Sequence, residues 1–254
     1  REVIIMLGEE RQNAILSIVN DKKSVTVQEL MKILDISEST IRRDLNLLDR
    51  EGQLMKVHGG AMANNSGYHT IDDEVAVRKG LNRDEKLSIA RYAAELIKTG
   101  DLVYLDAGTT TELMIDFINQ SDVTFVTNSF SHAKRLSERG YTTYILGGEV
   151  KAVTEAIVGE EAIFGLDKYN FTKGFFGTNG VTVKNGFTTP DVKEAMVKRK
   201  AVQKTKKKYI LCDSSKFSQV SSVTFADFES AGIITSKIED TSFKVYKNIT
   251  EVEK

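Results

Sequence analysis

Short apolar runs and helical patterns alternate over most of this 254-residue chain, and this alternation constrains the fold more than any other feature. The apolar runs are typical of buried strands and lie at 102–105, 123–126, 144–146, 174–176, 209–212 and 232–234. The helical patterns between them lie at 87–97, 111–118, 131–139 and 191–204. Because strands that alternate with helices of this length form parallel sheets, we expect an open α/β sheet from residue 84 onward.

The first sixty residues have a different pattern. Helical stripes of apolar residues lie at 11–20, 28–34 and 37–51. Ser37 is a suitable N-cap for the third helix, and Gly52 is a suitable residue to end it. An alternating stretch at 54–57 then leads into Gly59 and Gly60. Short helices followed by a hairpin predict a winged helix-turn-helix.

A segment without apolar periodicity lies between these two patterns. Residues 64–67 are small and polar, and residues 72–74 are acidic. Such a stretch is typical of a linker. We therefore expect an N-terminal domain at 6–61, a linker at 62–83 and a larger domain at 84–250.

Composition excludes several classes of protein. A single cysteine rules out a disulfide framework and a cysteine-rich zinc site, and it fits a reducing cytoplasm. No apolar run approaches the ~18 residues that span a bilayer. The formal net charge of −1 excludes a protein that coats nucleic acid over its whole surface, although it allows a local site. We expect a cytoplasmic protein that binds no membrane, no metal and no cofactor.

The helix expected at 37–51 has two chemically different faces. At 100° per residue, Ile41, Leu45 and Leu48 share one side and are expected in the core. A solvated surface is one interpretation of the other side, and the nine basic and ten acidic side chains of residues 1–63 give no charge excess that would favour DNA. The hydroxyl, amide and guanidinium groups there nevertheless suit base edges and phosphates in a major groove. They belong to Ser39, Thr40, Arg42, Arg43, Asn46 and Arg50.

Loops after the expected strands of the larger domain are rich in small polar residues. Residues 106–111 follow one strand and lead directly into a helix, where backbone N–H groups and hydroxyls can surround an anion. A plain turn is the alternative for this loop alone. The carboxyl ends of parallel strands meet at one edge of a sheet. We therefore expect a ligand crevice that is also lined by residues 127–129, 147–148, 177–180 and 213–216.

A basic run coincides with the end of the helical pattern at 191–204. Lysines near the C-terminus of a helix interact favourably with its dipole. We therefore expect a solvated helix end, with an auxiliary DNA contact as the alternative. Cys212 lies in a buried strand pattern and is expected in the core. The basic run comprises Lys198, Arg199, Lys200, Lys204, Lys206, Lys207 and Lys208.

Three segments closely resemble the DeoR/GlpR family of bacterial repressors. They are 9–12 (Glu-Glu-Arg-Gln), 37–45 (Ser-Glu-Ser-Thr-Ile-Arg-Arg-Asp-Leu) and 57–61 (Val-His-Gly-Gly-Ala). The larger domain resembles the effector domain of that family, which shares its fold with ribose-5-phosphate isomerase. The resemblance implies a winged helix-turn-helix joined to an open α/β sheet sensor domain. It also implies that helix 37–51 is the recognition helix and that His58 lies near DNA phosphates.

The resemblance further implies roles for residues in the crevice. Asp106 belongs to the same site, and Glu194 matches the catalytic glutamate of the isomerase. The phosphate of a sugar phosphate is expected at Gly108, Thr109, Thr110, Thr111 and Lys216. The sugar hydroxyls are expected at Asn128, Asn179 and glycines at strand ends, namely Gly148, Gly177 and Gly180.

A sugar-phosphate isomerase is the alternative to a sensor. The isomerase motif has aspartates where this chain has Asn179 and Thr182, and neither an amide nor a hydroxyl can cycle the proton that isomerisation requires. We therefore expect a repressor without enzyme activity that binds double-stranded operator DNA and is released by a small phosphorylated sugar. A resemblance to fructose-operon repressors at 104–111, 114–117, 177–181 and 186–191 favours fructose 1-phosphate. Tagatose 6-phosphate is the nearest competitor.

A single recognition helix covers too few base pairs for specificity in a genome. We therefore expect a homodimer or a homotetramer. Sugar phosphate and operator DNA must then weaken each other's binding reciprocally. The linker is the candidate for transmitting that effect between the two domains.

Overall fold

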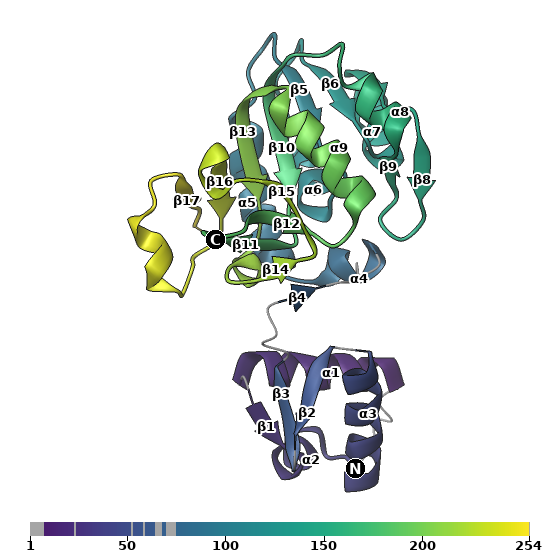
Figure 1. Cartoon of the computed structure of the whole chain (residues 1–254), viewed down its shortest axis with the longest axis vertical. Coiled ribbons are helices and arrows are strands. Elements are labelled where there is room, and N and C mark those ends of the chain that lie inside the picture. Colours follow the sequence, from purple (N-terminus) through teal and green to yellow (C-terminus); the bar gives the residue numbers. More distant parts are fainter. Residues whose placement is uncertain are drawn as a thin grey trace. The chain divides into compact units, whose positions relative to one another are not determined.

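The computed structural model describes residues 8–22, 24–51, 53–57, 59–63, 68–69 and 75–253. The chain divides into two compact units, Arg1–Gly67 and Tyr68–Lys254 (Figure 1). Gly52, which was expected to end the third helix, lies outside the described residues. Among the described residues, no helix combines the length and the apolar character that crossing a membrane requires.

The N-terminal unit is a winged helix-turn-helix, as the sequence predicts. Its strands form one antiparallel sheet in the order β1-β3-β2, and the β2–β3 hairpin is the wing. In chain order, its elements are α1 (Gly8–Lys22), β1 (Ser24–Thr26), α2 (Val27–Leu34), α3 (Glu38–Arg50), β2 (Leu54–Val57) and β3 (Gly60–Ala63).

Local hydrogen bonds set the turn between α2 and α3. A capping box starts α2, because the Glu29 N–H donates to the Thr26 hydroxyl and the Thr26 N–H donates to the Glu29 carboxylate. The helix ends at Asp35, whose φ of 54° reverses the chain direction in the left-handed region. Ser37 is the N-cap of α3, as expected. Its hydroxyl interacts with the hydroxyls of Ser39 and Thr40 and makes no side-chain capping bond.

The apolar side of α3 forms much of the core of this unit. Ile41 and Leu45 are completely buried and Leu48 is 1% exposed, which confirms the expected face. They belong to one hydrophobic cluster with Ile15 of α1 and Leu30 of α2. The orientation of α3 is therefore fixed by apolar packing against the other two helices.

The C-terminal unit contains a large sheet, smaller sheets and helices. Its strands are β4 (Tyr68–His69), β5 (Leu102–Leu105), β6 (Thr124–Thr127), β7 (Thr142–Ile145), β8 (Glu149–Lys151), β9 (Ala156–Val158), β10 (Phe171–Gly177), β11 (Gly180–Thr182), β12 (Gly186–Thr189), β13 (Thr205–Leu211), β14 (Val220–Ser221), β15 (Val223–Ala226), β16 (Gly232–Thr235) and β17 (Ile249–Glu251). Its α-helices are α4 (Val75–Gly80), α5 (Arg83–Glu95), α6 (Thr109–Phe117), α7 (Phe130–Glu138), α8 (Glu160–Gly165) and α9 (Val192–Gln203). Short 3₁₀ helices lie at Ser214–Lys216, Phe228–Ser230 and Thr241–Val245. Strand β4 and helix α4 lie within the segment expected as a linker.

The large sheet is parallel, as expected from the alternating pattern, and has the strand order β17-β16-β13-β10-β5-β6-β7. Helices cover both of its faces: α5 and α6 pack on one and α9 on the other (Figure 1). The chain proceeds from β5 outward to β7 and then returns to β10 on the other side of β5. Such a reversal of strand order opens a crevice beyond the carboxyl ends of the two central strands.

We predict that Leu45→Ala lowers the free energy of unfolding of the N-terminal unit by about 2–5 kcal/mol, because it leaves a cavity in the core. Leu47→Ala, on the exposed side of the same helix, is the matched control and should change that free energy by less than about 0.5 kcal/mol. Amide hydrogen exchange within residues 8–63 of the full chain measures the opening of this unit. Equal effects of the two substitutions would contradict the packing of α3.

Candidate functional site

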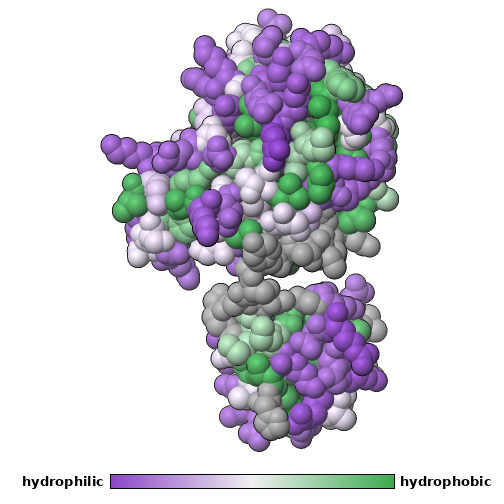
Figure 2. Space-filling view, in the orientation of Figure 1, coloured by the Kyte–Doolittle hydropathy of each residue, from purple (hydrophilic) through white to green (hydrophobic). Residues whose placement is uncertain are grey.

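The outer face of α3 is polar and exposed, and hydrophilic side chains gather over this part of the N-terminal unit (Figure 2). Arg42 Nε donates to Glu38 Oε1 at 2.7 Å, one turn earlier on the helix. Asn46 Oδ1 accepts a hydrogen bond from Lys56 Nζ of the wing at 2.5 Å. His58 lies outside the described residues. The exposed residues of the expected DNA-binding set are Ser39, Arg42, Arg43, Asn46 and Arg50, and Thr40 is half-buried.

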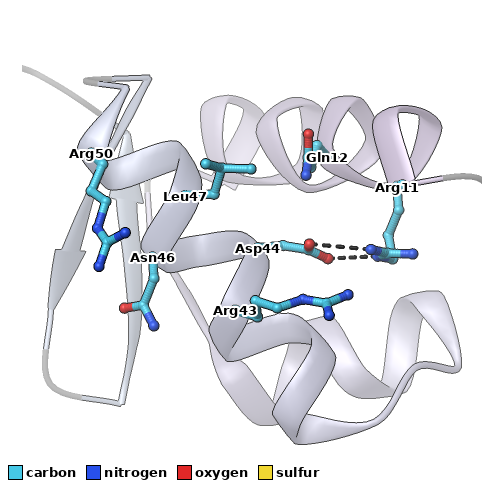
Figure 3. Close-up of a pocket in the computed structure, with 8 residues that line it drawn as sticks. Arg11, Gln12, Arg43, Asp44, Asn46, Leu47 and Arg50 are labelled. Carbon is cyan, nitrogen blue, oxygen red and sulfur yellow. Dashed lines mark hydrogen bonds and ion pairs between the residues drawn. The ribbon is translucent and has the colours of Figure 1, made fainter.

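A buried ion pair holds α3 against α1. Asp44 is only 2% exposed, and Arg11 donates to both of its carboxylate oxygens, with Nε–Oδ2 at 2.5 Å and Nη2–Oδ1 at 3.1 Å (Figure 3). Two parallel hydrogen bonds of this kind fix the relative orientation of the two groups. The burial of Asp44 was not expected from the sequence, because its partner lies 33 residues earlier.

This ion pair borders a surface pocket of about 520 Å³ between α1 and α3. Arginines from both helices lie around the pocket, so its rim can attract an anionic group such as a DNA phosphate. The pocket brings three residues of the expected DNA-binding set together with α1. Its lining residues are Gly8, Arg11, Gln12, Arg43, Asp44, Asn46, Leu47 and Arg50 (Figure 3).

In the C-terminal unit, Asp106 lies at the point where the strand order reverses. Its side chain is completely buried directly after β5, and its Oδ2 accepts the backbone N–H of Gly177, the last residue of β10, at 2.9 Å. Gly108 and Gly177 beside it are half-buried. Asp106 therefore joins the ends of the two central strands at the base of the expected crevice.

Lys198 of α9 is the partner of this carboxylate. Its ammonium group donates to Asp106 Oδ2 and lies 3.3 Å from the carbonyl oxygen of Gly177. Burial raises the pKa of Asp106, and the charge of Lys198 opposes that rise. The residue was expected on a solvated helix end; this expectation is wrong because Lys198 lies on the side of α9 that packs against the sheet and is 4% exposed. Further along the same basic run, Lys206 and Lys207 are exposed.

The loop after β5 leads into α6, with Gly108 as the N-cap residue. The Thr111 hydroxyl is buried and lies within hydrogen-bonding distance of the carbonyl oxygens of Asp106 and Gly108, at 2.7 Å and 2.8 Å. Thr109 and Thr110 are also largely buried. First-turn N–H groups of a helix lack intrahelical partners. An anion at this position would therefore be bound chiefly by backbone N–H groups.

Two other residues of the expected sugar site support the backbone of the crevice. Asn128, at the end of β6, accepts the N–H of Ala107 at 2.8 Å and donates to the Ile157 carbonyl at 3.4 Å. Gly148 has a φ of 139°, and a Cβ there would lie 2.5 Å from the Val158 carbonyl oxygen. The structure therefore brings both residues to the β6–β9 edge, where they hold neighbouring segments in place.

Glu194 occupies the first turn of α9 and is 6% exposed. Its Oε1 accepts hydrogen bonds from Lys151 Nζ at 3.0 Å and from the Thr154 hydroxyl at 2.5 Å. Its negative charge adds to the effect of burial in raising the pKa of Asp106, so the two carboxylates are neighbours.

Asn179 and Gly180 follow β10 on the same side of the unit. The Asn179 amide oxygen accepts the Thr189 hydroxyl at 3.1 Å. Gly180 is required by close packing, since a Cβ there would lie 2.5 Å from the Gln219 carbonyl oxygen. The two residues therefore connect the crevice to β12 and to the segment that precedes β14.

A cluster of cations lies beside the loop that follows β13. Burial lowers the pKa of Lys86 to about 8; Asp213 opposes this shift, and the positive charges of Lys216 and Arg78 add to it. Lys86 Nζ donates to the Arg78 carbonyl at 2.5 Å, and Arg78 Nε is buried without a hydrogen-bond partner among the described residues. Lysine and arginine side chains grouped in this way can bind a phosphate. Lys216 was among the residues expected at the phosphate, whereas Lys86 was not, because it lies in the first turn of α5 without a distinguishing motif.

Each of the two units matches the model of a known domain family. Residues 11–67 match the DeoR-like helix-turn-helix domain, and residues 81–237 match the DeoR C terminal sensor domain. The chain belongs to the DeoR family. This DeoR-family protein is therefore a transcriptional regulator with a DNA-binding unit and a sensor unit, which confirms the resemblance seen in the sequence.

Relatives cover nearly the whole of this DeoR-family chain. It is 43% identical over 249 residues to the uncharacterised HTH-type transcriptional regulator FruR of Bacillus subtilis, a match that covers 98% of each chain. It is 33% identical over 252 residues to the lactose phosphotransferase system repressor of Streptococcus mutans, covering 97% of this chain and 99% of the relative. Ribose 5-phosphate isomerase A from Methanocaldococcus jannaschii has a TM-score of 0.40 and 18% identity, covering 54% of this chain and 55% of that one.

We predict that Arg11→Met destabilises the N-terminal unit by about 3–5 kcal/mol, because it leaves the Asp44 carboxylate buried without its partner. Arg50→Met removes an exposed arginine from the same pocket and is the matched control, with an expected change below about 0.5 kcal/mol. Urea unfolding followed by hydrogen exchange in residues 8–63 compares the two variants. If Arg11→Met were as stable as Arg50→Met, the ion pair would not be what holds α3.

Proposed function

We propose that this regulator represses a sugar-utilisation operon and leaves its operator DNA when fructose 1-phosphate occupies the crevice of the sensor unit. The observation that carries the proposal is the cation cluster of Lys86, Arg78 and Lys216 beside a switch-point crevice, in a chain that also has an exposed recognition helix. The similarity to FruR and to lactose phosphotransferase system repressors supports a sugar-phosphate effector. Tagatose 6-phosphate is the competing effector.

Helix α3 reads the operator in this proposal. Arg43 and Arg50 reach base edges or phosphates from its exposed face, while the Arg11–Asp44 pair fixes the angle at which the helix is presented. Lys56 and His58 of the wing contact the adjacent phosphates. Two or more copies of the chain bind together in the cytoplasm, as a homodimer or homotetramer, because two half-sites provide the base contacts that one helix lacks.

The crevice binds the phosphate at one end and the sugar at the other. Lys86 and Lys216 supply positive charge, and the first turn of α6 supplies backbone donors. The sugar hydroxyls lie over the region of Asp106, Asn179 and the glycines at the strand ends. Binding alone is proposed, because Asn179 and Thr182 replace the acidic groups that an isomerase would need.

The segment between the two units transmits binding, because it contacts the crevice loops at several points. Strand β4 pairs with β14, and β14 begins four residues after Lys216. The Val75 N–H donates to the Val153 carbonyl, in the turn that carries Thr154, and Lys79 forms an ion pair with Glu112 of α6. A ligand that moves these loops therefore shifts the segment that leads to the DNA-binding unit.

The beginning of α5 is attached to the phosphate loop in the same way. Asn82 Nδ2 donates to Asp213 Oδ1 at 2.9 Å, and the Glu85 carboxylate accepts both the N–H and the hydroxyl of Ser214. A phosphate bound at Lys216 would act on these contacts directly. The coupling between effector and DNA is then expected to be about 1–3 kcal/mol, as in other two-site regulators.

We predict that Arg43→Ala weakens operator binding by about 1–3 kcal/mol, because a bidentate contact to a base is lost. DNA selected by the chain from a random duplex library serves as the operator, and fluorescence anisotropy at fixed salt measures the affinity. Lys134→Ala, which removes an exposed lysine from the sensor unit, is the charge-matched control and should leave binding unchanged. Unchanged affinity in Arg43→Ala would contradict its role in base contact.

We predict that Lys216→Ala abolishes release from that DNA by fructose 1-phosphate while DNA affinity stays within about twofold, because the phosphate loses a charged partner. Anisotropy of the labelled DNA during titration with the sugar phosphate measures release. Lys206→Ala, an exposed lysine on β13, is the control and should respond as the unaltered chain does. Full release from the Lys216→Ala variant would show that the phosphate binds elsewhere.

A further inference from the structure

We propose that the sensor unit associates with a second copy of this chain through the open edge of β7, so that the two large sheets join across a two-fold axis. This inference rests on the proposed function, in which at least two copies read the operator, and it specifies the surface that joins them. Strand β7 is the last strand of the sheet, with β6 on one side and, within the described part of the chain, no strand on the other. The outer N–H and C=O groups of β7 are therefore available to another strand.

The sequence of this edge lacks the features that normally prevent strands from pairing between molecules. Natural edge strands are protected by charged residues, proline or bulges. Residues 141–147 (Tyr-Thr-Thr-Tyr-Ile-Leu-Gly) contain no charged residue and no proline, and the register of β7 with β6 is unbroken. The strand at the opposite edge of the sheet, β17, ends at the exposed Glu251 and is followed by the exposed Glu253. The two edges therefore differ, and β7 is the one suited to pairing.

The backbone of β7 fits a second β7 that runs in the antiparallel direction. The Leu146 N–H donates to the Thr127 carbonyl of β6, so the N–H and C=O groups of the alternate residues Thr143 and Ile145 point to the open side. Across a two-fold axis, Thr143 of one copy lies opposite Ile145 of the other, and each such pair exchanges two hydrogen bonds. The outward groups of both residues then have partners. The axis lies at Tyr144, which faces Tyr144 of the second copy.

Apolar side chains are exposed on both faces of this edge. Tyr144 and Ile145, which point to opposite faces because they are neighbours in a strand, are 51% and 44% exposed. On the face of Tyr144, helix α8 ends close to the strand, since a Cβ at Gly165 would lie 3.7 Å from Leu146 Cδ2. Phe164, the residue before Gly165, is 69% exposed. A second copy paired with β7 would cover these side chains.

Helix α7 lies on the other face and presents small residues and one aromatic side chain to the open edge. Its Arg135 donates to Asp116 of α6 at 2.6 Å, which identifies the inner side of the helix. At 100° per residue, Phe130, Ala133 and Ser137 lie within about 40° of the opposite direction. Phe130 is 65% exposed. The small residues allow two α7 helices to approach each other, and Phe130 is an aromatic anchor of the kind that is enriched at interfaces.

A second copy is the partner that fits this edge. Among the described residues, every exposed aromatic side chain except Tyr92 borders it. Lys134 and Glu138 lie one helical turn apart at its margin. Because a two-fold axis makes the two α7 helices antiparallel, Lys134 of one copy lies nearest to Glu138 of the other. An exposed pair of this kind orients the two copies and adds little affinity. The strand pairing and the aromatic side chains supply the affinity.

Sedimentation velocity of the full chain without DNA or sugar phosphate tests this surface. We expect the unaltered chain to sediment as a dimer or a tetramer. Tyr144→Lys should halve its mass at the same concentration, with a dissociation constant raised at least ~30-fold, because two like charges would face each other at the axis. Tyr92→Lys, which changes an exposed tyrosine of α5 in the same way, is the matched control and should keep the mass of the unaltered chain.

A mixing experiment tests the axis itself. Tyr144→Glu should dissociate as Tyr144→Lys does, because like charges again face each other. An equimolar mixture of the two variants should regain the mass of the unaltered chain, since opposite charges then meet across the axis. Damage to the fold of each chain could not be repaired by mixing. Should the charged variants not fold, Tyr144→Cys must form a cross-linked dimer on mild oxidation, because facing Cβ atoms lie within reach of a disulfide; Tyr92→Cys must not.

The outcomes separate the surface from the function on which it rests. If the unaltered chain is a monomer, if Tyr144→Lys keeps the mass of Tyr92→Lys, or if the mixture stays dissociated, the β7 surface is overturned, and the repressor function stands as long as a sugar phosphate releases the DNA. If the mixture regains its mass while no sugar phosphate releases the DNA, the proposed function fails and the surface stands.

Discussion

The sensor unit depends on one buried carboxylate. Asp106 binds the Gly177 N–H and the Lys198 ammonium group, and so it ties β5, β10 and α9 together where the strand order reverses. Removing one partner of such a buried pair leaves an uncompensated charge, which is strongly destabilising. The loop into α6 depends on the same residue, since the Thr111 hydroxyl lies 2.7 Å from its carbonyl oxygen. Asp106 therefore fixes both the strand ends and the loop that border the crevice.

The DNA-binding unit uses the same physical device on a smaller scale. There the Arg11–Asp44 pair fixes α3 from its inner side, while Arg42, Arg43 and Arg50 lie on the exposed side of the helix. In both units a buried ion pair orients a helix that carries residues of the candidate sites. The segment that contains β4 and α4 contacts several crevice loops, so a ligand in the sensor unit can influence the chain that leads to α3.

Local patterns were sufficient to predict the alternating sheet, the winged helix-turn-helix and the two faces of α3. They could not reveal Asp44 or Lys198, because each is a charged residue whose burial depends on a partner distant in sequence, 33 residues away for Asp44 and 92 for Lys198. Spacing offered one overlooked signal, since Lys198 follows Glu194 by one helical turn and adjoins the buried Val197. The short strands β8, β11 and β12 were also missed, because charged residues, threonine or glycine interrupt their apolar runs.

In the proposed function, a sugar phosphate in the crevice acts on DNA binding through the segment that contains β4, α4 and the start of α5. Hydrogen exchange of the full chain with and without saturating fructose 1-phosphate tests it most directly, because amide exchange reports local opening segment by segment. We expect altered exchange in 75–86 and 213–221 as well as in the crevice loops, at ligand concentrations that release DNA. If DNA were released while exchange changed only in 106–111 and 177–180, the coupling through this segment would be contradicted.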